Sequence, residues 1–548
     1  MAKSKERRES LVYHAKPRPG KIEVVPTKKY RSQRDLAIAY SPGVAIPCQE
    51  IDKDPSNVYK YTNKSNLVAV ISNGTAVLGL GDIGPNASKP VMEGKALLFK
   101  IFADIDVFDI EISEKDPDKF VDVVKSISTT FGGINLEDIK APEAFKIEKD
   151  LIEQLDIPVM HDDQHGTAII SAAALLNALE LVNKKIEDVK IVVSGAGAAA
   201  VACTNLYISF GAKRQNIVMT DSKGVINKDR DNLTDEKKYF ATDRKISSLG
   251  EAMVNSDVFI GLSMANIVSE EMLSSMSKNP IVFAMANPDP EIDYDKAMSV
   301  RDDIIFATGR SDLPNQVNNV LGFPFIFRGA LDVRATKINE EMKKAAVIAL
   351  AELAKKPVPE QVNIAYDETK LNFGKHYIIP KPFDPRLISE IPPAVAKAAI
   401  KSGVALEPII DWDKYTQVLE ERLGSNQKLV RIIHRRARKA KDKKLVFAEA
   451  DHLDVLKAAQ ICFEEGIAEP ILLGGKKIIE ELMDSLEFNE KIEIIDPKDK
   501  INKDRIDKYS QILFKKLKRK GKTLDDVKRL LRGRDYFGSM MVENGDAD

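Results

Sequence analysis

The sequence predicts an α/β protein with parallel sheets covered by helices, and two observations favour this fold class. Short apolar segments typical of buried strands alternate with helical segments through the middle of the chain. A glycine-rich turn from Gly195 to Ala200 follows one such strand and opens a helix, as in a Rossmann-type dinucleotide-binding domain. The chain has 548 residues, which at roughly 150 residues per domain indicates about three domains.

The N-terminal part, which we assign to residues 1–160, is predicted to be a mixed α/β domain. Residues 1–30 are polar and contain prolines, so we expect them to form an arm. Beyond residue 36, short β-rich runs such as residues 67–71 are mixed with amphipathic helices such as residues 117–130.

Residues 161–405 are predicted to form the Rossmann-type domain. An Ala/Leu-rich helix is expected from residue 166 to about residue 181, and a second helix over residues 198–210 follows the glycine-rich turn. The expected parallel strands lie at residues 189–193, 216–220, 258–261, 281–284 and 304–307.

The sequence changes character near residue 403, which marks the predicted start of a third α/β domain. We expect a linker over residues 406–425 and the domain over residues 426–548, with strands at residues 444–448 and 470–475. Because such a layer has few strands with which to complete a sheet, we expect that the chain is truncated.

Composition argues against several functional classes. The formal net charge of −1 produces no field that would attract nucleic acid or an anionic membrane. The charged N-terminus is not a signal peptide, and no run of about 18 apolar residues predicts a membrane helix. Cys48, Cys203 and Cys462 are far apart and have neither metal nor redox spacing, which fits a reducing cytoplasm.

The basic segment 431–439 raises the question of nucleic-acid binding. Its apolar residues have helical spacing, but no aromatic residues are interleaved. A solvated helix face is therefore the favoured interpretation. The same segment could also meet the phosphates of a CoA-like ligand or an acidic partner subunit.

The glycine-rich turn predicts a dinucleotide site. Gly195, Gly197 and Ala200 allow close approach of a pyrophosphate to the start of a helix. Asp221 ends the next predicted strand, where an acid that binds ribose belongs, and Lys223 could instead engage a 2′-phosphate. The turn alone would also fit any α/β domain, so NAD and NADP both stay open.

Two acidic pairs predict a metal site. Asp162 and Asp163 stand between two histidines, and Glu137 and Asp138 follow an apolar stretch. Three or four carboxylates suit Mg²⁺ or Mn²⁺, which prefer oxygen ligands. Zinc is less favoured because the segment does not match His-Glu-x-x-His and no cysteine is nearby. Any one such pair alone would more often lie in a solvated loop.

Other polar residues have two interpretations each. Lys95 enters an apolar helix, where it is either a surface side chain or a desolvated base with a lowered pKa. Tyr40 precedes a turn and is otherwise a packing residue. Asn287, Asn318 and Asn319 follow later strands, so they either cap turns or hold a substrate carboxylate and a nicotinamide amide.

These motifs together carry a resemblance to the bacterial malic enzymes. It covers roughly residues 15–405 and rests on several independent segments: residues 39–43 (AYSPG), 79–84 (GLGDIG), 93–96 (EGKA), 161–167 (HDDQHGT), 307–311 (ATGRS) and 314–319 (PNQVNN). The tail from about residue 425 is similar to the first part of a phosphotransacetylase-like domain. This combination resembles the large, two-domain members of the family.

The resemblance implies a role for each matched residue. Tyr40 matches the general acid, Lys95 the general base and Asp162 the carboxylate that partners the lysine. Glu137, Asp138 and Asp163 match the metal ligands, here for Mg²⁺ or Mn²⁺. Asn287 and Asn318 match the amides that bind the substrate carboxylate, with Asn287 and Asn319 near the cofactor. The animal-type arginine for malate is replaced by Ala76, so Ser41 and Gly43 are expected to contribute to carboxylate binding.

The implied reaction is oxidative decarboxylation of (S)-malate to pyruvate and CO₂ with reduction of NADP or NAD. The alternatives are a malolactic or oxaloacetate-decarboxylating variant, and a tail that transfers acyl groups or senses acetyl-CoA. The tail lacks the half that carries transferase chemistry in true phosphotransacetylases. The family also implies a homodimer or a higher homo-oligomer.

Overall fold

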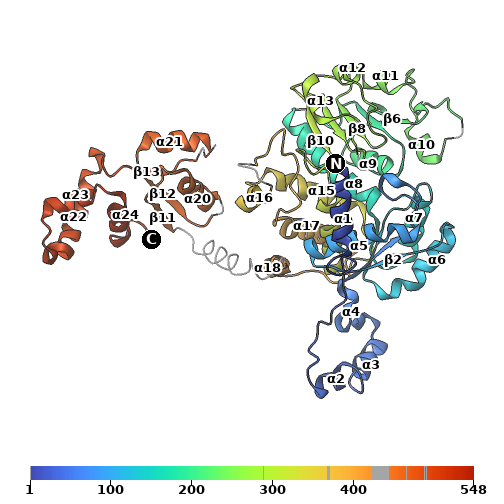
Figure 1. Ribbon diagram of the computed structural model, residues 1–548, viewed down its shortest axis with the longest axis horizontal. Helices are drawn as coiled ribbons and strands as arrows, with labels where there is room; N and C mark the ends of the chain where they lie inside the picture. The colour runs from blue at the N-terminus through green and yellow to red at the C-terminus, as the bar shows by residue number, and fades with distance from the viewer. Residues whose placement is uncertain are drawn as a thin grey trace. The chain divides into compact units, whose positions relative to one another are not determined.

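The computed structural model describes residues 2–231, 233–287, 289–366, 371–422, 443–464, 466–486, 488 and 490–548 (Figure 1). The chain divides into two compact units, Met1–Leu423 and Gly424–Asp548. In the described part of the chain, no helix combines the length and apolar character needed to cross a membrane. The basic segment 431–439 lies outside the described residues.

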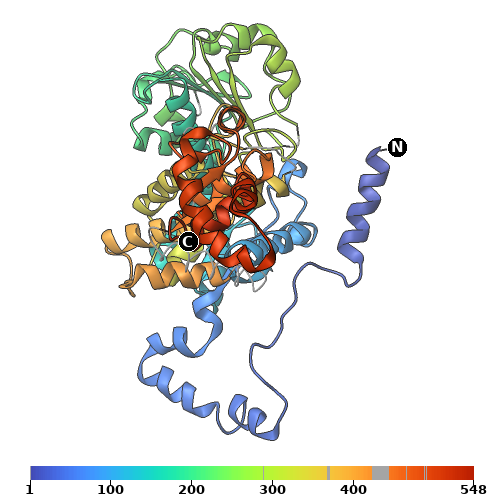
Figure 2. The same ribbon diagram turned by 90° about the vertical axis from the view of Figure 1, so that its left-hand side faces the viewer.

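The first unit begins with an arm of short helices. These are α1 (Ala2–Ala15), α2 (Gln33–Ala39), α3 (Ala45–Lys53) and α4 (Val58–Tyr61). Ser32 starts α2 with a capping box that includes Asp35. Neither α2 nor α3 buries a residue, and both lie away from the sheets in two perpendicular views (Figures 1 and 2). The arm thus extends beyond the predicted residues 1–30, to the end of α4, and contains four α-helices among the described residues.

The first sheet is fully parallel, in the order β2-β1-β3-β4. It comprises β1 (Leu67–Ser72), β2 (Asp106–Glu111), β3 (Gly133–Leu136) and β4 (Val159–His161), with helices α5 (Pro85–Ala103), α6 (Pro117–Ile127) and α7 (Glu143–Gln154). All six residues of β1 are buried, as its apolar run predicts. Asp116 caps α6, and the predicted helix 117–130 ends in a 3₁₀ turn.

The second sheet has the order β10-β9-β8-β5-β6-β7, in which only β7 is antiparallel. Its strands are β5 (Ile191–Ser194), β6 (Ile217–Asp221), β7 (Gly224–Val225), β8 (Val258–Gly261), β9 (Ile281–Ala284) and β10 (Ile305–Thr308). The helices between them are α9 (Ala198–Ser209), α10 (Asp235–Phe240), α11 (Leu249–Met253), α12 (Glu270–Ser274) and α13 (Tyr294–Val300). Chain order reverses beside β5, which places a ligand crevice at its carboxyl end.

Helix α8 (Asp162–Leu181) begins four residues earlier than predicted and connects the two sheets. Asp162 and Asp163 therefore occupy its first turn, where the helix dipole stabilises negative charge. The rest of α8 is almost entirely buried, against α9 and α15. The remaining helices of the unit are α14 (Phe323–Asp332), α15 (Glu340–Lys355), α16 (Glu360–Ala365), α17 (Leu387–Lys401) and α18 (Trp412–Arg422).

Helix α18 occupies part of the predicted linker. Its Leu419 is buried, Tyr415 donates a hydrogen bond to Asp332 (2.8 Å), and Arg422 pairs with Asp104 (3.0 Å). Residues 412–422 therefore belong to the first unit. Their composition predicts a linker, but their tertiary contacts attach them to that unit.

The second unit has a three-stranded parallel sheet in the order β11-β12-β13. Its elements are β11 (Lys444–Phe447), α20 (Leu453–Glu464), β12 (Glu469–Leu473), α21 (Lys476–Ser485), β13 (Glu493–Ile495), α22 (Lys503–Leu517), α23 (Leu524–Leu530) and α24 (Arg534–Glu543). The two predicted strands are present, and β13 is a third, three-residue strand that the sequence pattern did not indicate.

Candidate active site

Four carboxylates and one lysine meet at the carboxyl edge of the first sheet. Glu137 and Asp138 directly follow β3, and Asp162 and Asp163 directly follow β4. Because β3 and β4 are neighbouring parallel strands, their carboxyl ends share one edge. Lys95 reaches this edge from α5.

Three of the carboxylates form a compact oxygen cluster. One oxygen from each of Glu137, Asp138 and Asp163 lies within 4.8 Å of the other two. The backbone N–H of Asp138 donates to Asp163 Oδ2 (2.8 Å), and Asp138 has a positive φ of 54°. A left-handed conformation is costly for a residue other than glycine, and such strain is often found at functional sites.

This cluster fits a divalent cation. The oxygen Oδ2 of Asp138 is buried and has no hydrogen-bond partner among the described residues. Carboxylate oxygens are the ligands that Mg²⁺ and Mn²⁺ prefer. The residues predicted as metal ligands are therefore together in space, with donor atoms of the required kind.

Lys95 is buried between two carboxylates. Its Nζ lies 2.6 Å from Asp162 Oδ2 and 2.7 Å from Glu137 Oε1. The ring of Phe323, from α14, faces the same ammonium at 4.3 Å. Lys95 is only 9% exposed, which excludes the alternative of a surface lysine.

The electrostatics of the cluster are dominated by burial and by excess negative charge. Burial, followed by the charge of Asp163, raises the pKa of Asp138 to about 7. Burial also raises the pKa of Glu137 and of Asp162. Four carboxylates face one ammonium, so a divalent cation would neutralise most of the excess negative charge of the cluster.

The expected lowering of the Lys95 pKa is not found. Burial alone would lower it, but the charges of Asp162, Glu137 and Asp163 together raise the pKa of Lys95 above its ordinary value. The prediction considered desolvation and left out these neighbours. A cation among the carboxylates would offset their effect on the lysine.

Amide side chains hold the carboxylates in place. Asn319 donates to Asp162 Oδ2 (3.2 Å) and accepts from the Thr167 hydroxyl (3.0 Å), while Asn135 donates to Glu137 Oε2 (2.9 Å). The sequence analysis did not single out Asn135, Thr167 or Phe323. For Asn135 a signal was present, since it stands two residues before Glu137 and shares its side of the strand.

The two histidines of the acidic motif are not among the three clustered carboxylates, and both lie near Glu148. His165 Nε2 is 3.1 Å from Glu148 Oε2, and the backbone N–H of His161 donates to Glu148 Oε1 (2.7 Å). Burial alone would raise the pKa of Glu148, but the histidines lower it to about 2. The buried His161 ring has its Nδ1 3.8 Å from Asp163 Oδ2, but the three residues whose ligand atoms lie within 4.8 Å of one another are all carboxylates, a set more typical of Mg²⁺ or Mn²⁺ than of zinc.

The arm carries the remaining residues assigned to proton transfer and carboxylate binding. Tyr40, Ser41 and Gly43 lie at the turn between α2 and α3, and the Tyr40 side chain is 77% exposed. In the single chain, α2 and α3 lie away from α5, the helix that carries Lys95 (Figures 1 and 2). At the cluster itself, the backbone N–H of Ala76 donates to the Asp138 carbonyl (3.0 Å).

The glycine-rich turn lies at the carboxyl end of β5. Gly195 has a φ of 117°, and a Cβ there would come within 2.5 Å of the Leu262 carbonyl oxygen. Gly197 precedes α9, and a Cβ there would meet open space. Ala200 is buried. The turn therefore leaves room at the start of α9, as a bound pyrophosphate requires.

Asp221, at the end of β6, is surrounded by cations. Its carboxylate accepts two hydrogen bonds from Arg230 (3.0 and 2.9 Å), one from Lys237 Nζ (2.9 Å) and one from the Lys223 backbone (2.9 Å). Burial alone would raise the pKa of Asp221, but these bonds hold it well below its usual range. The sequence analysis missed Arg230 and Lys237, which are near Asp221 only through the fold.

The predicted asparagines occupy different positions. Asn319 belongs to the carboxylate cluster, as described. The Asn318 side chain accepts from the Val320 N–H (3.0 Å) and caps a short 3₁₀ helix. Asn287 is exposed in the loop that follows β9.

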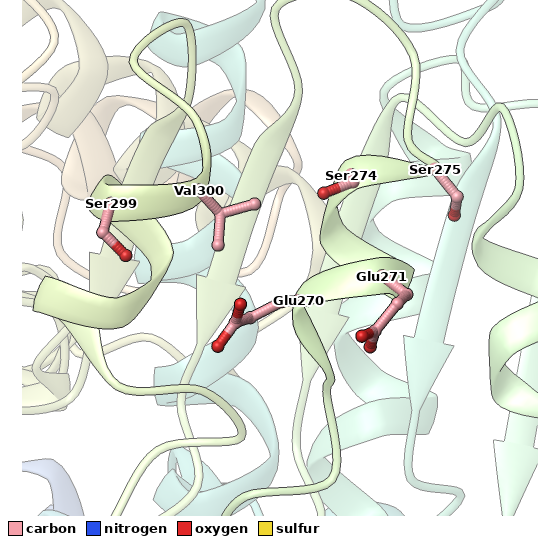
Figure 3. A pocket seen from close by; sticks show the side chains of 6 residues that line it. All are labelled: Glu270, Glu271, Ser274, Ser275, Ser299 and Val300. Atoms are coloured by element: carbon pink, nitrogen blue, oxygen red, sulfur yellow. The ribbon is translucent and has the colours of Figure 1, made fainter.

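A separate surface hollow between α12 and α13 offers no comparable chemistry. Figure 3 shows Glu270 and Glu271 from α12, with Ser299 and Val300 from α13. Glu270 already pairs with Lys296 (3.2 Å), and the Ser269 hydroxyl lowers the pKa of the exposed Glu271.

Comparisons with known families match three parts of the chain. Residues 19–152 match "Malic enzyme, N-terminal domain", residues 164–368 match "Malic enzyme, NAD binding domain", and residues 428–548 match "Phosphate acetyl/butaryl transferase".

Individual relatives span almost the whole chain. It is 53% identical to an NADP-dependent malic enzyme of Haemophilus influenzae, over 99% of this chain and 72% of that protein. It is 49% identical to an NAD-dependent malic enzyme of Rhizobium meliloti, over 98% and 70%. The crystal structure of malic enzyme from Pyrococcus horikoshii is 40% identical, with a TM-score of 0.70 over 79% of this chain and 99% of that one.

Proposed function

The chain belongs to the malic enzyme family, and we propose how its residues carry out the oxidative decarboxylation of malate. The observation that carries the proposal is the buried Lys95 ammonium between Asp162 and Glu137, beside three clustered carboxylates. We assign the substrate site to this edge of the first sheet and cofactor binding to residues 161–405.

Lys95 is the proposed general base. In its neutral form, which a bound cation would favour by offsetting the nearby carboxylates, Lys95 would accept the proton of the C2 hydroxyl as the alcohol is oxidised to a ketone; the bound nicotinamide cofactor would supply the hydride acceptor. The contacts from Asp162 and Glu137 hold the amine in one place, and proton transfer by such a positioned group typically contributes about 10²–10⁴-fold in rate.

Glu137, Asp138 and Asp163 are the proposed ligands of Mg²⁺ or Mn²⁺. When bound, the cation supplies Lewis-acid stabilisation of negative charge on the substrate oxygens. The C3–C4 bond then breaks, CO₂ leaves, and the electron pair remains on the three-carbon product. A proton delivered to C3 gives pyruvate.

Tyr40 is the proposed donor of that proton, with Ser41 and Gly43 near the substrate carboxylate. This requires the arm to reach an active site, and we propose that it does so in a homodimer or higher homo-oligomer. Support comes from the apolar residues that the arm exposes to solvent: Leu36, Ile38, Val44 and Ile46. Association would bury them.

NADP is the proposed main cofactor, with its pyrophosphate at Gly195, Gly197 and Ala200. Asp221 and Lys223 would then lie beside the adenosine ribose. The carboxylate of Asp221 is already neutralised by Arg230 and Lys237, which favours a 2′-phosphate over a free hydroxyl. Asn287, Asn318 and Asn319 are proposed to contact the nicotinamide and the substrate carboxylate.

The domain of residues 426–548 is proposed to bind acetyl-CoA as an effector. Its match to an acyl transferase family supports an acyl-CoA ligand. Cys48 and Cys203 form no disulfide among the described residues, and on this ground we propose a cytoplasmic location.

The test is to follow the absorbance of reduced nicotinamide with (S)-malate and Mn²⁺, with NADP and with NAD, while pyruvate is measured. Equal amounts of reduced cofactor and pyruvate support oxidative decarboxylation. Lactate without net cofactor reduction would instead identify the malolactic variant, and decarboxylation of oxaloacetate alone would identify the other alternative.

A further inference from the structure

Glu291 is a buried carboxylate at the ligand edge of the second sheet that the reaction described above does not use. It is fully buried, and burial raises its pKa although backbone N–H groups oppose the shift. Burying a carboxylate costs free energy unless hydrogen bonds compensate. The hydrogen bonds that its two oxygens accept therefore indicate which parts of the fold the Glu291 carboxylate holds together.

The two oxygens of Glu291 join two loops. Oε1 accepts the backbone N–H of Ser263, in the loop after β8, at 3.1 Å. Oε2 accepts the backbone N–H of Ala286, in the loop after β9, at 3.1 Å. Each oxygen serves one loop, so both acceptors are needed to hold the two loops together.

Gly261, the last residue of β8, provides the space for this carboxylate. A Cβ at Gly261 would lie 2.3 Å from the Glu291 carboxyl carbon and within 2.6 Å of both its oxygens. No side chain fits there without displacing the carboxyl group. The pair Gly261 and Glu291 is therefore sterically complementary.

The loop after β8 also packs on the dinucleotide turn. The Ser263 hydroxyl lies 2.9 Å from the Ser194 hydroxyl, and the N–H of Leu262 donates to the Ser194 carbonyl (2.8 Å). Ser194 directly precedes Gly195. On the other side, Ala286 directly precedes Asn287. One carboxylate thus links the proposed pyrophosphate turn to the proposed nicotinamide amide.

We propose that Glu291 is a positioning residue that fixes the nicotinamide half of the cofactor relative to its pyrophosphate. The proposal rests on the proposed function. Hydride transfer depends strongly on distance, and a displacement of about 1 Å can cost 10²-fold in rate. Glutamine would not replace Glu291, because its NH₂ group would face a backbone N–H and one loop would be released.

The experiment compares Glu291→Gln with the wild-type protein and with Glu270→Gln, an exposed control in the same domain. NADPH binding is measured by fluorescence titration, Mn²⁺ binding by calorimetry, and hydride transfer by the isotope effect with C2-deuterated malate. We expect on the order of tenfold weaker NADPH binding and a larger isotope effect, with Mn²⁺ affinity unchanged. Glu270→Gln should match the wild type in all three.

Wild-type NADPH affinity and isotope effect in Glu291→Gln would overturn the proposal. So would a parallel loss of Mn²⁺ and NADPH binding, because the carboxylate would then support the fold in general. If Glu291→Gln does not fold, Gly261→Ala displaces the carboxylate without removing it, and the same outcomes decide. If the wild-type protein binds NADPH but does not oxidise malate, the proposed function fails while the titration still tests Glu291.

Discussion

Lys95 and Asp162 are 67 residues apart in the sequence, yet their side chains meet at 2.6 Å. The contact joins the middle of α5 to the first turn of α8, so it connects the first sheet with the helix that leads into the second. The residues proposed for proton transfer and for metal binding thereby meet around one buried ion pair.

Lys95→Ala should lower kcat by about 10²–10⁴-fold, because it removes the proposed general base. NADPH binding should persist, since Gly195 and its turn belong to the other sheet. The measurement is steady-state kinetics together with NADPH titration. Lys100→Ala, which alters an exposed lysine of the same helix, is the control. Wild-type turnover in Lys95→Ala would exclude the base assignment.

Asp163→Ala should weaken Mn²⁺ binding by on the order of 100-fold, since it removes one of three clustered ligands and leaves two buried acids. Calorimetric titration with Mn²⁺ measures this effect. Asp150→Ala, which alters a partly exposed residue of α7 outside the cluster, should bind Mn²⁺ like the wild type. Unchanged affinity in Asp163→Ala would remove this residue from the ligand set.

Metal affinity should depend on pH through Asp138. The pKa of Asp138 is about 7 in the metal-free cluster, so below that pH a proton competes with the cation. We expect Mn²⁺ binding to weaken by up to about tenfold per unit as pH falls below 7, and to level off above it. Titrations at several pH values measure this. Asp138→Asn should bind more weakly and lose the part of the pH dependence near pH 7; a wild-type profile that is flat between pH 6 and 8 would contradict the assignment.

The same pKa predicts the stability of the metal-free protein. A carboxyl pKa raised above its unfolded value of about 4 favours folding at low pH. Stability should therefore fall as pH rises from about 4 to about 7, and Mg²⁺ should restore it. Thermal unfolding with and without Mg²⁺ measures the effect, and an equal shift by Mg²⁺ in Asp163→Ala would argue against this site.

Sequence reasoning predicted most of the strands because fully buried parallel strands are continuous apolar runs. It failed where an element is too short to show a pattern of apolar and polar residues, as in β7 with two residues. It also failed for α18, whose place in the first unit depends on contacts of Tyr415 and Arg422 with distant residues.

The candidate site was predicted in the same uneven way. Glu137, Asp138 and Asp163 are adjacent to strand ends, so topology alone brings them together. The pKa of Lys95 could not be predicted, because it depends on which carboxylates face the amine. Glu291 has no motif of its own, and its role is evident only from the space that Gly261 leaves. The position of Tyr40 on an exposed arm is likewise absent from any local pattern.

Gly195→Ala should abolish tight NADPH binding while Mn²⁺ still binds. The new Cβ would meet the Leu262 carbonyl oxygen at 2.5 Å, and the φ of 117° is unfavourable for alanine. Fluorescence titration measures the loss. Gly211→Ala, whose Cβ would meet only Ile186 at 3.5 Å but which shares a positive φ of 114°, separates the steric effect from backbone strain. Equal NADPH affinity in both variants would contradict a pyrophosphate site at Gly195.

Removal of the second unit should separate regulation from catalysis. A chain that ends at Arg422 keeps α18, which packs on the first unit through Leu419, Tyr415 and Arg422. A chain that ends before Trp412 would lose these contacts and should be less stable. We expect the chain that ends at Arg422 to oxidise malate at a rate similar to the full chain. It should lose any inhibition by acetyl-CoA, because an effector shifts a protein between two states only when the domain that binds it is present. Kinetics of both chains with and without acetyl-CoA measure this. If the chain that ends at Arg422 is still inhibited by acetyl-CoA, the effector site lies in the first unit. If this chain has no activity, the second unit is required for catalysis.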